Sequence, residues 1–174
     1  MPIISVHALR DFASGLLLAG GFPQEDAAAM ADLLVWANRR GVDSHGVLRI
    51  PRYIEMLAQG LVKADHAMTI AQGFGAIRVL DANKAPGAVA MNRAVAEAGT
   101  MAAQFGLGWC GVRRTSHAGA VGYFVEKLAL QGMVGIAMTA SKPLMSYYGA
   151  KGEALSTNPL AIAVPSRNGD DPLI

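Results

Sequence analysis

Two of the four histidines, His45 and His117, occupy positions suited to proton transfer. Each lies in a loop flanked by glycine, at the entrance to an expected helix. Imidazole is the side chain whose ordinary pKa suits proton transfer near neutral pH, and catalytic groups usually lie on loops of a rigid scaffold. His7 at a helix start and His66 in a polar linker are expected at the surface. A loop histidine bonded to a backbone carbonyl is the alternative for both His45 and His117.

The neighbours of His45 favour acid–base chemistry on an organic acid. Ser44 can orient the imidazole through a hydroxyl hydrogen bond, and Arg49 stands four residues beyond His45. If a turn brings Arg49 back toward His45, its planar guanidinium can hold a substrate carboxylate through two hydrogen bonds. A proton-transferring imidazole beside a carboxylate-binding arginine is what a dehydrogenase of 2-hydroxy or 2-oxo acids needs. The alternative for Arg49 is a surface arginine near a helix start.

Other kinds of site find no support in the sequence. No Gly-x-Gly-x-x-Gly follows an expected strand, because the nearest match, at 106–111, runs into a strand instead. Neither a Walker-type phosphate loop nor a Gly-x-Ser-x-Gly nucleophile segment is present. Cys110 lies in an apolar stretch, where we expect it to pack. A metal site built from His45, His117 and Cys110 has no supporting spacing, so no metal is expected.

A predicted series of helices and strands positions the two histidine loops. Apolar residues at helical spacing, bounded by Gly and Pro, predict helices over 6–19, 23–39 and 51–60. After Lys63, strands alternate with helices. The predicted strands are 76–80, 109–112 and 134–138, the predicted helices are 85–105 and 119–131, and a turn-rich stretch, 140–158, precedes a final apolar run at 160–164. This alternation predicts the α/β fold class, with a helical segment at the N-terminus.

The helix predicted at 119–131 bears on the role of His117. The positive end of a helix lowers the pKa of a nearby imidazole and favours a neutral, hydrogen-bonding role. His45 has the stronger claim to be the acid/base, because Ser44 can fix its orientation and Arg49 can bring a carboxylate alongside.

Composition narrows the class of protein. The chain has 174 residues, of which 52% are apolar and 16% charged, with a net charge of +2. No basic stripe is dense enough to follow nucleic-acid phosphates, and no apolar run reaches the ~18 residues of a membrane span. The N-terminus lacks the basic flank of a signal peptide, and a single cysteine agrees with a reducing cytoplasm.

The share of apolar residues exceeds what one small hydrophobic core can bury. We therefore expect either a partner that covers apolar surface or residues that are missing from the sequence. Residues 166–174 are expected to form a polar turn followed by the start of a strand, and we interpret this ending as a truncation.

Four ordered segments resemble those of the malate/L-lactate dehydrogenase family. The segment from Arg40 to Tyr53 resembles the family's Arg-Gly-x-x-Ser-His-Gly-x-x-Arg-x-Pro. Three later segments also match, in the same order and at similar separations: Ser116-His117-x-Gly119, Thr139-x-Ser141-x-Pro143 and 157–165. The resemblance covers essentially the whole chain, although family chains are longer.

The resemblance implies an NAD(P)-dependent oxidoreductase of small 2-hydroxy or 2-oxo acids. The family fold is a non-Rossmann α/β fold, and its members form dimers with the active site near the interface. By resemblance, residues 1–66 belong to a helical substrate and dimer domain, and residues 67–174 are the first part of the NAD(P)-binding domain. The implied site residues are His45 and His117 for catalysis, Ser44 and Arg49 for the substrate, and Ser141, Thr157 and Asn158 for the cofactor.

Departures from the family pattern leave the substrate open. Arg114 stands where asparagine is common, Ser156 replaces a glycine, and Tyr148-Gly149 replaces a common Trp-Gly. The family's next segment, with an aspartate near the nicotinamide, would follow Ile174. The 174-residue chain alone is therefore expected to be inactive. Two alternatives stay open: reduction of a cyclic imino acid, and a non-catalytic fragment that only self-associates.

Overall fold

The N-terminal part is helical, as predicted. The computed structural model describes residues 3–167 and 171–174 and begins with helix α1, Val6–Ala19, which Ser5 caps by accepting a hydrogen bond from the Ala8 amide. Helix α2, Gln24–Arg39, carries two acidic residues in its first turn, where they complement the helix dipole. Two short 3₁₀ turns, η1 (Asp43–His45) and η2 (Val47–Arg49), lead into helix α3, Ile50–Ala58.

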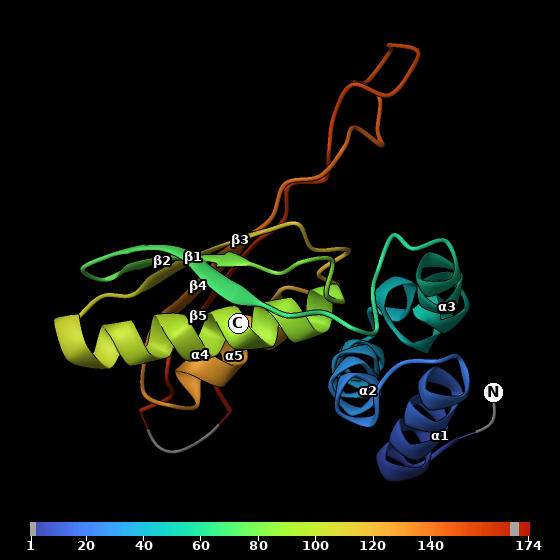
Figure 1. Ribbon diagram of the computed structural model, residues 1–174, viewed down its shortest axis with the longest axis horizontal. Coiled ribbons are helices and arrows are strands. Elements are labelled where there is room, and N and C mark those ends of the chain that lie inside the picture. Colours follow the sequence, from blue (N-terminus) through green and yellow to red (C-terminus); the bar gives the residue numbers. More distant parts are fainter. Residues whose placement is uncertain (1–2, 168–170) are drawn as a thin grey trace.

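The rest of the chain is mixed α/β, which confirms the predicted class. Figure 1 shows the long helix α4 lying along the strands, with the helical part to one side. The elements in chain order are β1 (Thr69–Phe74), β2 (Ile77–Asp81), α4 (Gly87–Phe105), β3 (Trp109–Arg113), α5 (Gly122–Ala129), β4 (Gly135–Met138) and β5 (Leu160–Ala163). Strands β1 and β2 pair antiparallel, β2 and β3 pair parallel through the α4 crossover, and β4 and β5 form a separate antiparallel pair.

Two elements differ from the sequence prediction. Strand β1 was not predicted: all six of its residues are exposed, so it has no alternation of apolar and polar faces, and a register shift interrupts it between Ile70 and Gln72. Helix α5 was predicted at 119–131 but is shorter, because Gly119 adopts a left-handed conformation (φ 80°) and the helix begins only at Gly122.

The largest core joins the helical part to the start of α4 and to α5. Phe124 of α5 and Leu17, Leu33 and Leu34 of α1 and α2 are fully buried within it. His66 lies beside this core, contrary to the prediction of a surface position. Its Nε2 bonds the Asp26 carboxylate at 2.7 Å, and its side chain is only 12% exposed.

An extended arm formed by residues 139–158 projects from the body, as the orange trace in Figure 1 shows. It corresponds to the predicted turn-rich stretch. Two backbone hydrogen bonds between Met145 and Leu155 hold its two halves together. Beyond β5, Leu173 pairs with Val164 in an isolated bridge, which agrees with the predicted strand start; most of the preceding polar turn lies outside the described residues. Within the described part of the chain, no helix has both the length and the apolar character needed to cross a bilayer.

Candidate functional site

The loop that carries His45 is fixed by one asparagine of α2. Asn38 Oδ1 accepts a hydrogen bond from the Val47 amide at 2.9 Å, and Asn38 Nδ2 donates to Asp43 Oδ1 at 2.6 Å. A Cβ at Gly46 would overlap the Asn38 amide, so only glycine allows this close approach. The asparagine and the glycine together hold η1, which ends at His45, and η2, which follows Gly46.

The structure brings Ser44, His45 and Arg49 together as predicted from their spacing. Ser44 Oγ lies 3.0 Å from His45 Nδ1, and Arg49 Nε donates to the Ser44 carbonyl oxygen at 2.6 Å. The turn therefore does bring Arg49 back toward His45. The Arg49 and His45 side chains are both partly exposed, so a small molecule can reach them.

The loop that carries His117 is packed tightly against the start of α4. The Gly87 amide donates to Ser116 Oγ at 2.9 Å, and a Cβ at Gly87 would overlap the His117 carbonyl. On the other side, Gly119 has a φ of 80° and abuts Leu33 of α2. Glycine is required at both positions, one for close approach and one for its conformation.

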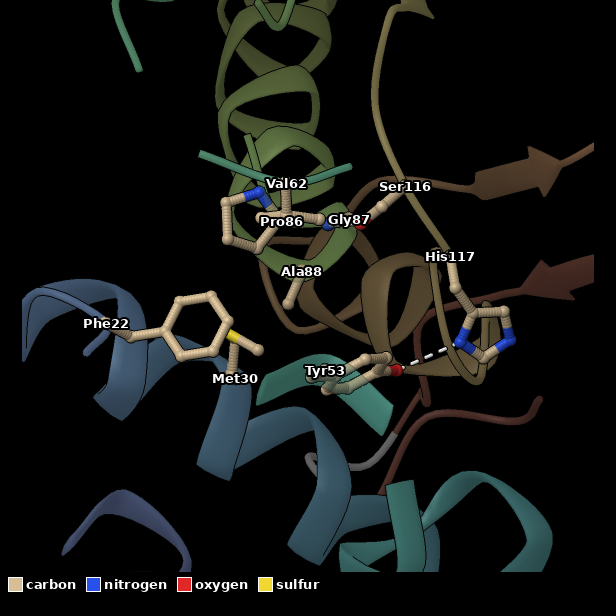
Figure 2. A pocket seen from close by; sticks show the side chains of 9 residues that line it. All are labelled: Phe22, Met30, Tyr53, Val62, Pro86, Gly87, Ala88, Ser116 and His117. Atoms are coloured by element: carbon tan, nitrogen blue, oxygen red, sulfur yellow. Dashed lines mark hydrogen bonds between the residues drawn. The ribbon is translucent and has the colours of Figure 1, made fainter. Parts of the chain in front are cut away.

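His117 meets a tyrosine that the sequence did not single out. Tyr53 Oη lies 2.9 Å from His117 Nδ1, and Figure 2 shows the other ring nitrogen pointing away from the tyrosine. The His117 ring centroid is 5.4 Å from that of His45. The available sequence signal for Tyr53 was its place four residues after Arg49, because residues i and i+4 share one face of a helix.

Loss of hydration keeps all three side chains neutral, and the charge of Arg49 adds to this effect at the two histidines. Partial burial, then Arg49, then His45 lower the pKa of His117 to about 4, although the outer edge of its ring remains open to solvent. Partial burial and then Arg49 also lower the pKa of His45. Burial raises the pKa of Tyr53 to about 12, against the opposing effect of Arg49. The lowered pKa of His117 was predicted, but its causes are burial and Arg49 rather than the helix that begins at Gly122.

The cavity behind Tyr53 and His117 is too small for a substrate. Its volume is about 10 Å³, room for about one water molecule. Figure 2 shows the nine residues that line it: Phe22, Met30, Tyr53, Val62, Pro86, Gly87, Ala88, Ser116 and His117.

The predicted cofactor residues lie at the base of the arm. The amides of Ser141 and Asn158 both donate to Ser156 Oγ, at 3.1 and 3.4 Å, and the Ser141 and Ser156 hydroxyls are 2.7 Å apart. Ser141, Thr157 and Asn158 are exposed. Hydroxyl and amide groups of this kind suit the ribose and phosphate oxygens of a dinucleotide. Across the described residues, no hydrogen bond or ring contact links this group to the histidines.

No metal site emerges from the described residues, in which no cluster of three or more His, Cys, Asp or Glu side chains is placed to hold an ion. Cys110 is half-buried in β3, and burial, followed by the charge of Glu97, raises the pKa of its thiol. A raised pKa keeps the sulfur protonated and unreactive, in line with a packing role.

Comparison with known proteins gives the family. Residues 4–174 match the malate/L-lactate dehydrogenase family. The chain is 34% identical over 168 residues to ureidoglycolate dehydrogenase (NAD⁺) of Escherichia coli, covering 97% of this chain and 48% of the relative. The solved malate dehydrogenase of Pyrococcus horikoshii superimposes with a TM-score of 0.91 at 34% identity, over 97% of this chain and 48% of that one. The Δ1-piperideine-2-carboxylate reductase of Pseudomonas syringae superimposes with a TM-score of 0.87 at 28% identity, over 99% and 52%.

The chain thus spans about half the length of the relatives it matches. The matched region contains both histidine loops, the arm and all three strands of the larger sheet. The family resemblance of the four sequence segments is confirmed: the chain belongs to the malate/L-lactate dehydrogenase family.

Proposed function

We propose that this chain carries the acid-binding and proton-transfer part of an NAD(P)-dependent oxidoreductase. The reaction is hydride transfer between nicotinamide and a small 2-hydroxy or 2-oxo acid of the malate or lactate type. One observation carries the proposal: Arg49 is anchored by the Ser44 carbonyl in the same loop as His45, and the His45 ring centroid lies 5.4 Å from that of His117. The lowered pKa of both imidazoles, to which Arg49 contributes, agrees with this arrangement.

Arg49 is the carboxylate-binding residue in this proposal. Its Nε is held by the Ser44 carbonyl, which fixes the plane of the guanidinium. The two terminal nitrogens have no hydrogen-bond partner among the described residues, so they can donate a parallel pair of hydrogen bonds to the two oxygens of a substrate carboxylate. A lysine could not supply this planar arrangement.

Binding of the acid also prepares the histidines. Because Arg49 lowers the pKa of both imidazoles, a carboxylate that neutralises its charge raises both values toward the ordinary one. A bound nicotinamide cofactor supplies or accepts the hydride. His45, oriented by Ser44, then gives its proton to the oxygen of the reduced carbonyl, and takes it back in the oxidation direction.

His117 acts as a neutral hydrogen-bond donor in this scheme. The Tyr53 hydroxyl is buried, and its proton finds its acceptor in His117 Nδ1. That bond leaves the proton of a neutral imidazole on Nε2, which points away from Tyr53. Nε2–H can then polarise the substrate carbonyl.

The remaining parts of the proposal concern the cofactor and assembly. Ser141, Thr157 and Asn158 bind part of NAD or NADP, and the names of the relatives include enzymes of both cofactors. Residues 1–66 contribute to a substrate and dimer domain, and 67–174 to the cofactor domain. The protein works as a cytoplasmic homodimer without nucleic acid or membrane partners.

A second substrate class has one specific observation in its favour. The solved relative from Pseudomonas syringae is a reductase of a cyclic imino acid, piperideine-2-carboxylate. Such a substrate also carries a carboxylate next to the reduced carbon, so Arg49 would hold it in the same way. A role as a non-catalytic, self-associating unit is the remaining alternative, and the exposed apolar residues of β4 and β5 favour it.

The proposal is tested with an active protein that contains this sequence, either the chain itself or a longer polypeptide. Oxidation of NADH or NADPH is followed with a panel of 2-oxo acids and one cyclic imino acid. In Arg49→Lys, we expect KM for the acid to rise by roughly ten- to a hundredfold, the equivalent of about 1.5–3 kcal/mol, while KM for the cofactor stays constant. An unchanged KM for the acid, or an equal loss for the cofactor, would contradict the proposed role of Arg49.

A further inference from the structure

The loop that leads into His117 begins with a strained arginine. Arg114 has a φ of 54°, a left-handed conformation that residues with a Cβ seldom adopt. It is the first residue after β3 and lies three residues before His117. A backbone held in this conformation has to be stabilised by its surroundings.

The Arg114 side chain supplies that stabilisation. Its Nε donates to Asp81 Oδ1 at 2.8 Å, and its Nη2 donates to Asn83 Oδ1 at 3.0 Å. Asp81 ends β2, is only 8% exposed, and also receives the Asn83 amide at 3.0 Å. Burial alone would raise the pKa of Asp81, but the Asn83 amide and the arginines lower it overall, so the carboxylate stays charged.

The turn held by Arg114 is continuous with the contacts that place His117. The Lys84 amide donates to the Arg114 carbonyl at 2.7 Å, and Thr115 Oγ1 donates to the Ala85 carbonyl at 3.1 Å. The next residue, Ser116, accepts from the Gly87 amide at 2.9 Å. Each residue from 114 to 116 is therefore bonded either to the loop between β2 and α4 or to the first residue of α4, and His117 follows directly.

We propose that Arg114 is a positioning residue, whose guanidinium, held by Asp81 and Asn83, fixes the turn that places the His117 imidazole against Tyr53. An effect of Arg114 on catalysis rests on the proposed function, whereas its effect on the position of His117 is independent of that function.

Arg113 offers a matched control. It pairs with the other oxygen of the same carboxylate, Asp81 Oδ2, at 3.1 Å, and its side chain is 58% exposed, as is that of Arg114. Arg113, however, belongs to β3, where the ladder to β2 already fixes its backbone. Its loss should weaken the ion pair equally without releasing the His117 loop.

The experiment compares Arg114→Gln with Arg113→Gln in the 174-residue chain, by NMR of the histidine ring nitrogens and protons across a pH titration. In the parent chain and in Arg113→Gln, His117 should be in the Nε2–H form with a strongly lowered pKa. In Arg114→Gln, its pKa should rise toward the ordinary value and both tautomers should appear, because the ring is no longer held against Tyr53. Arg114→Lys should give an intermediate result, because one ammonium cannot reach both Asp81 and Asn83 as the guanidinium does.

A wild-type His117 signal in Arg114→Gln would overturn the proposal, as would an equal change in Arg113→Gln. In an active protein that contains this sequence, kcat/KM for the acid should fall about 10- to 100-fold in Arg114→Gln, mainly through a higher KM, and stay unchanged in Arg113→Gln. An absence of turnover in every variant, the parent included, would count against the proposed function. The NMR comparison would still decide the role of Arg114.

Discussion

Arg49 is the residue on which the proposed chemistry of the site depends. Its Nε is fixed by Ser44, it lies in the same loop as His45, and its charge lowers the pKa of both histidines. The sequence predicted these three neighbours, because a short turn can only bring back residues a few positions apart. Tyr53 was missed because its partner, His117, lies 64 residues away in the chain. A contact of that length depends on how α3 and the loop after β3 pack.

Removal of the Arg49 charge tests this electrostatic coupling directly. In Arg49→Gln, the pKa of His117 should rise above its value of about 4, and the pKa of His45 should rise as well. Partial burial, the larger cause of both lowered values, remains, so neither should exceed the ordinary value. NMR titration of the two imidazoles in the 174-residue chain measures this. An unchanged titration of both histidines would show that Arg49 does not reach them.

At the scale of elements, each histidine loop makes one close contact with a helix, α2 for the His45 loop and α4 for the His117 loop, and each contact needs a glycine. Gly46 lies against Asn38 of α2, and Gly87, the first residue of α4, lies against His117. Periodicity predicted the helices, since each has an apolar face, but it carries no information about which glycine faces a neighbouring backbone. The pair of His66 and Asp26 escaped prediction for the same reason, because the two residues lie 40 positions apart in sequence. Strand β1 escaped prediction because all of its residues are exposed, so its sequence shows no alternation of buried and exposed positions.

Two glycines of α4 form a matched pair for testing this close approach. Gly87→Ala should displace the His117 loop and lower the free energy of unfolding by about 1–3 kcal/mol, the usual cost of overpacking. Gly99→Ala is the control, because its Cβ would meet only the side chains of Leu128 and Gln131, at ordinary distances of 3.5 and 3.9 Å. Since alanine favours helix, Gly99→Ala should stabilise the protein by about 0.5–1 kcal/mol. Chemical denaturation measures both, and equal effects at the two positions would refute the packing argument.

The molecule as a whole presents unusual apolar surface. The outer face of β4 and β5 is made of Ile136, Met138, Leu160 and Ile162, each about half exposed, while the inner face packs on α5. Phe12 and Leu16 of α1 are also exposed. Composition predicted that apolar area would be left over, but only the structure shows on which elements it lies.

This surface should drive association of the 174-residue chain. We expect light scattering at micromolar concentration to show a dimer or larger species, because apolar faces of this kind rarely stay exposed in monomers. The double variant Ile136→Lys, Ile162→Lys changes one cross-strand pair of this face. It should reduce association if the outer face of β4 and β5 forms the contact. A clean monomer for the parent chain would contradict the prediction.

The central claim is that the two histidines beside Arg49 handle the oxygen of a bound acid, His45 by proton transfer and His117 as a neutral donor. Steady-state kinetics of His45→Gln and His117→Gln, in an active protein that contains this sequence, tests it most directly. We predict that kcat falls by about 10²–10⁴ in His45→Gln with little change in cofactor affinity, and that His117→Gln mainly raises KM for the acid. The larger loss of kcat in His117→Gln would reverse the two roles, and a near-normal kcat in both variants would contradict the assignment of this site.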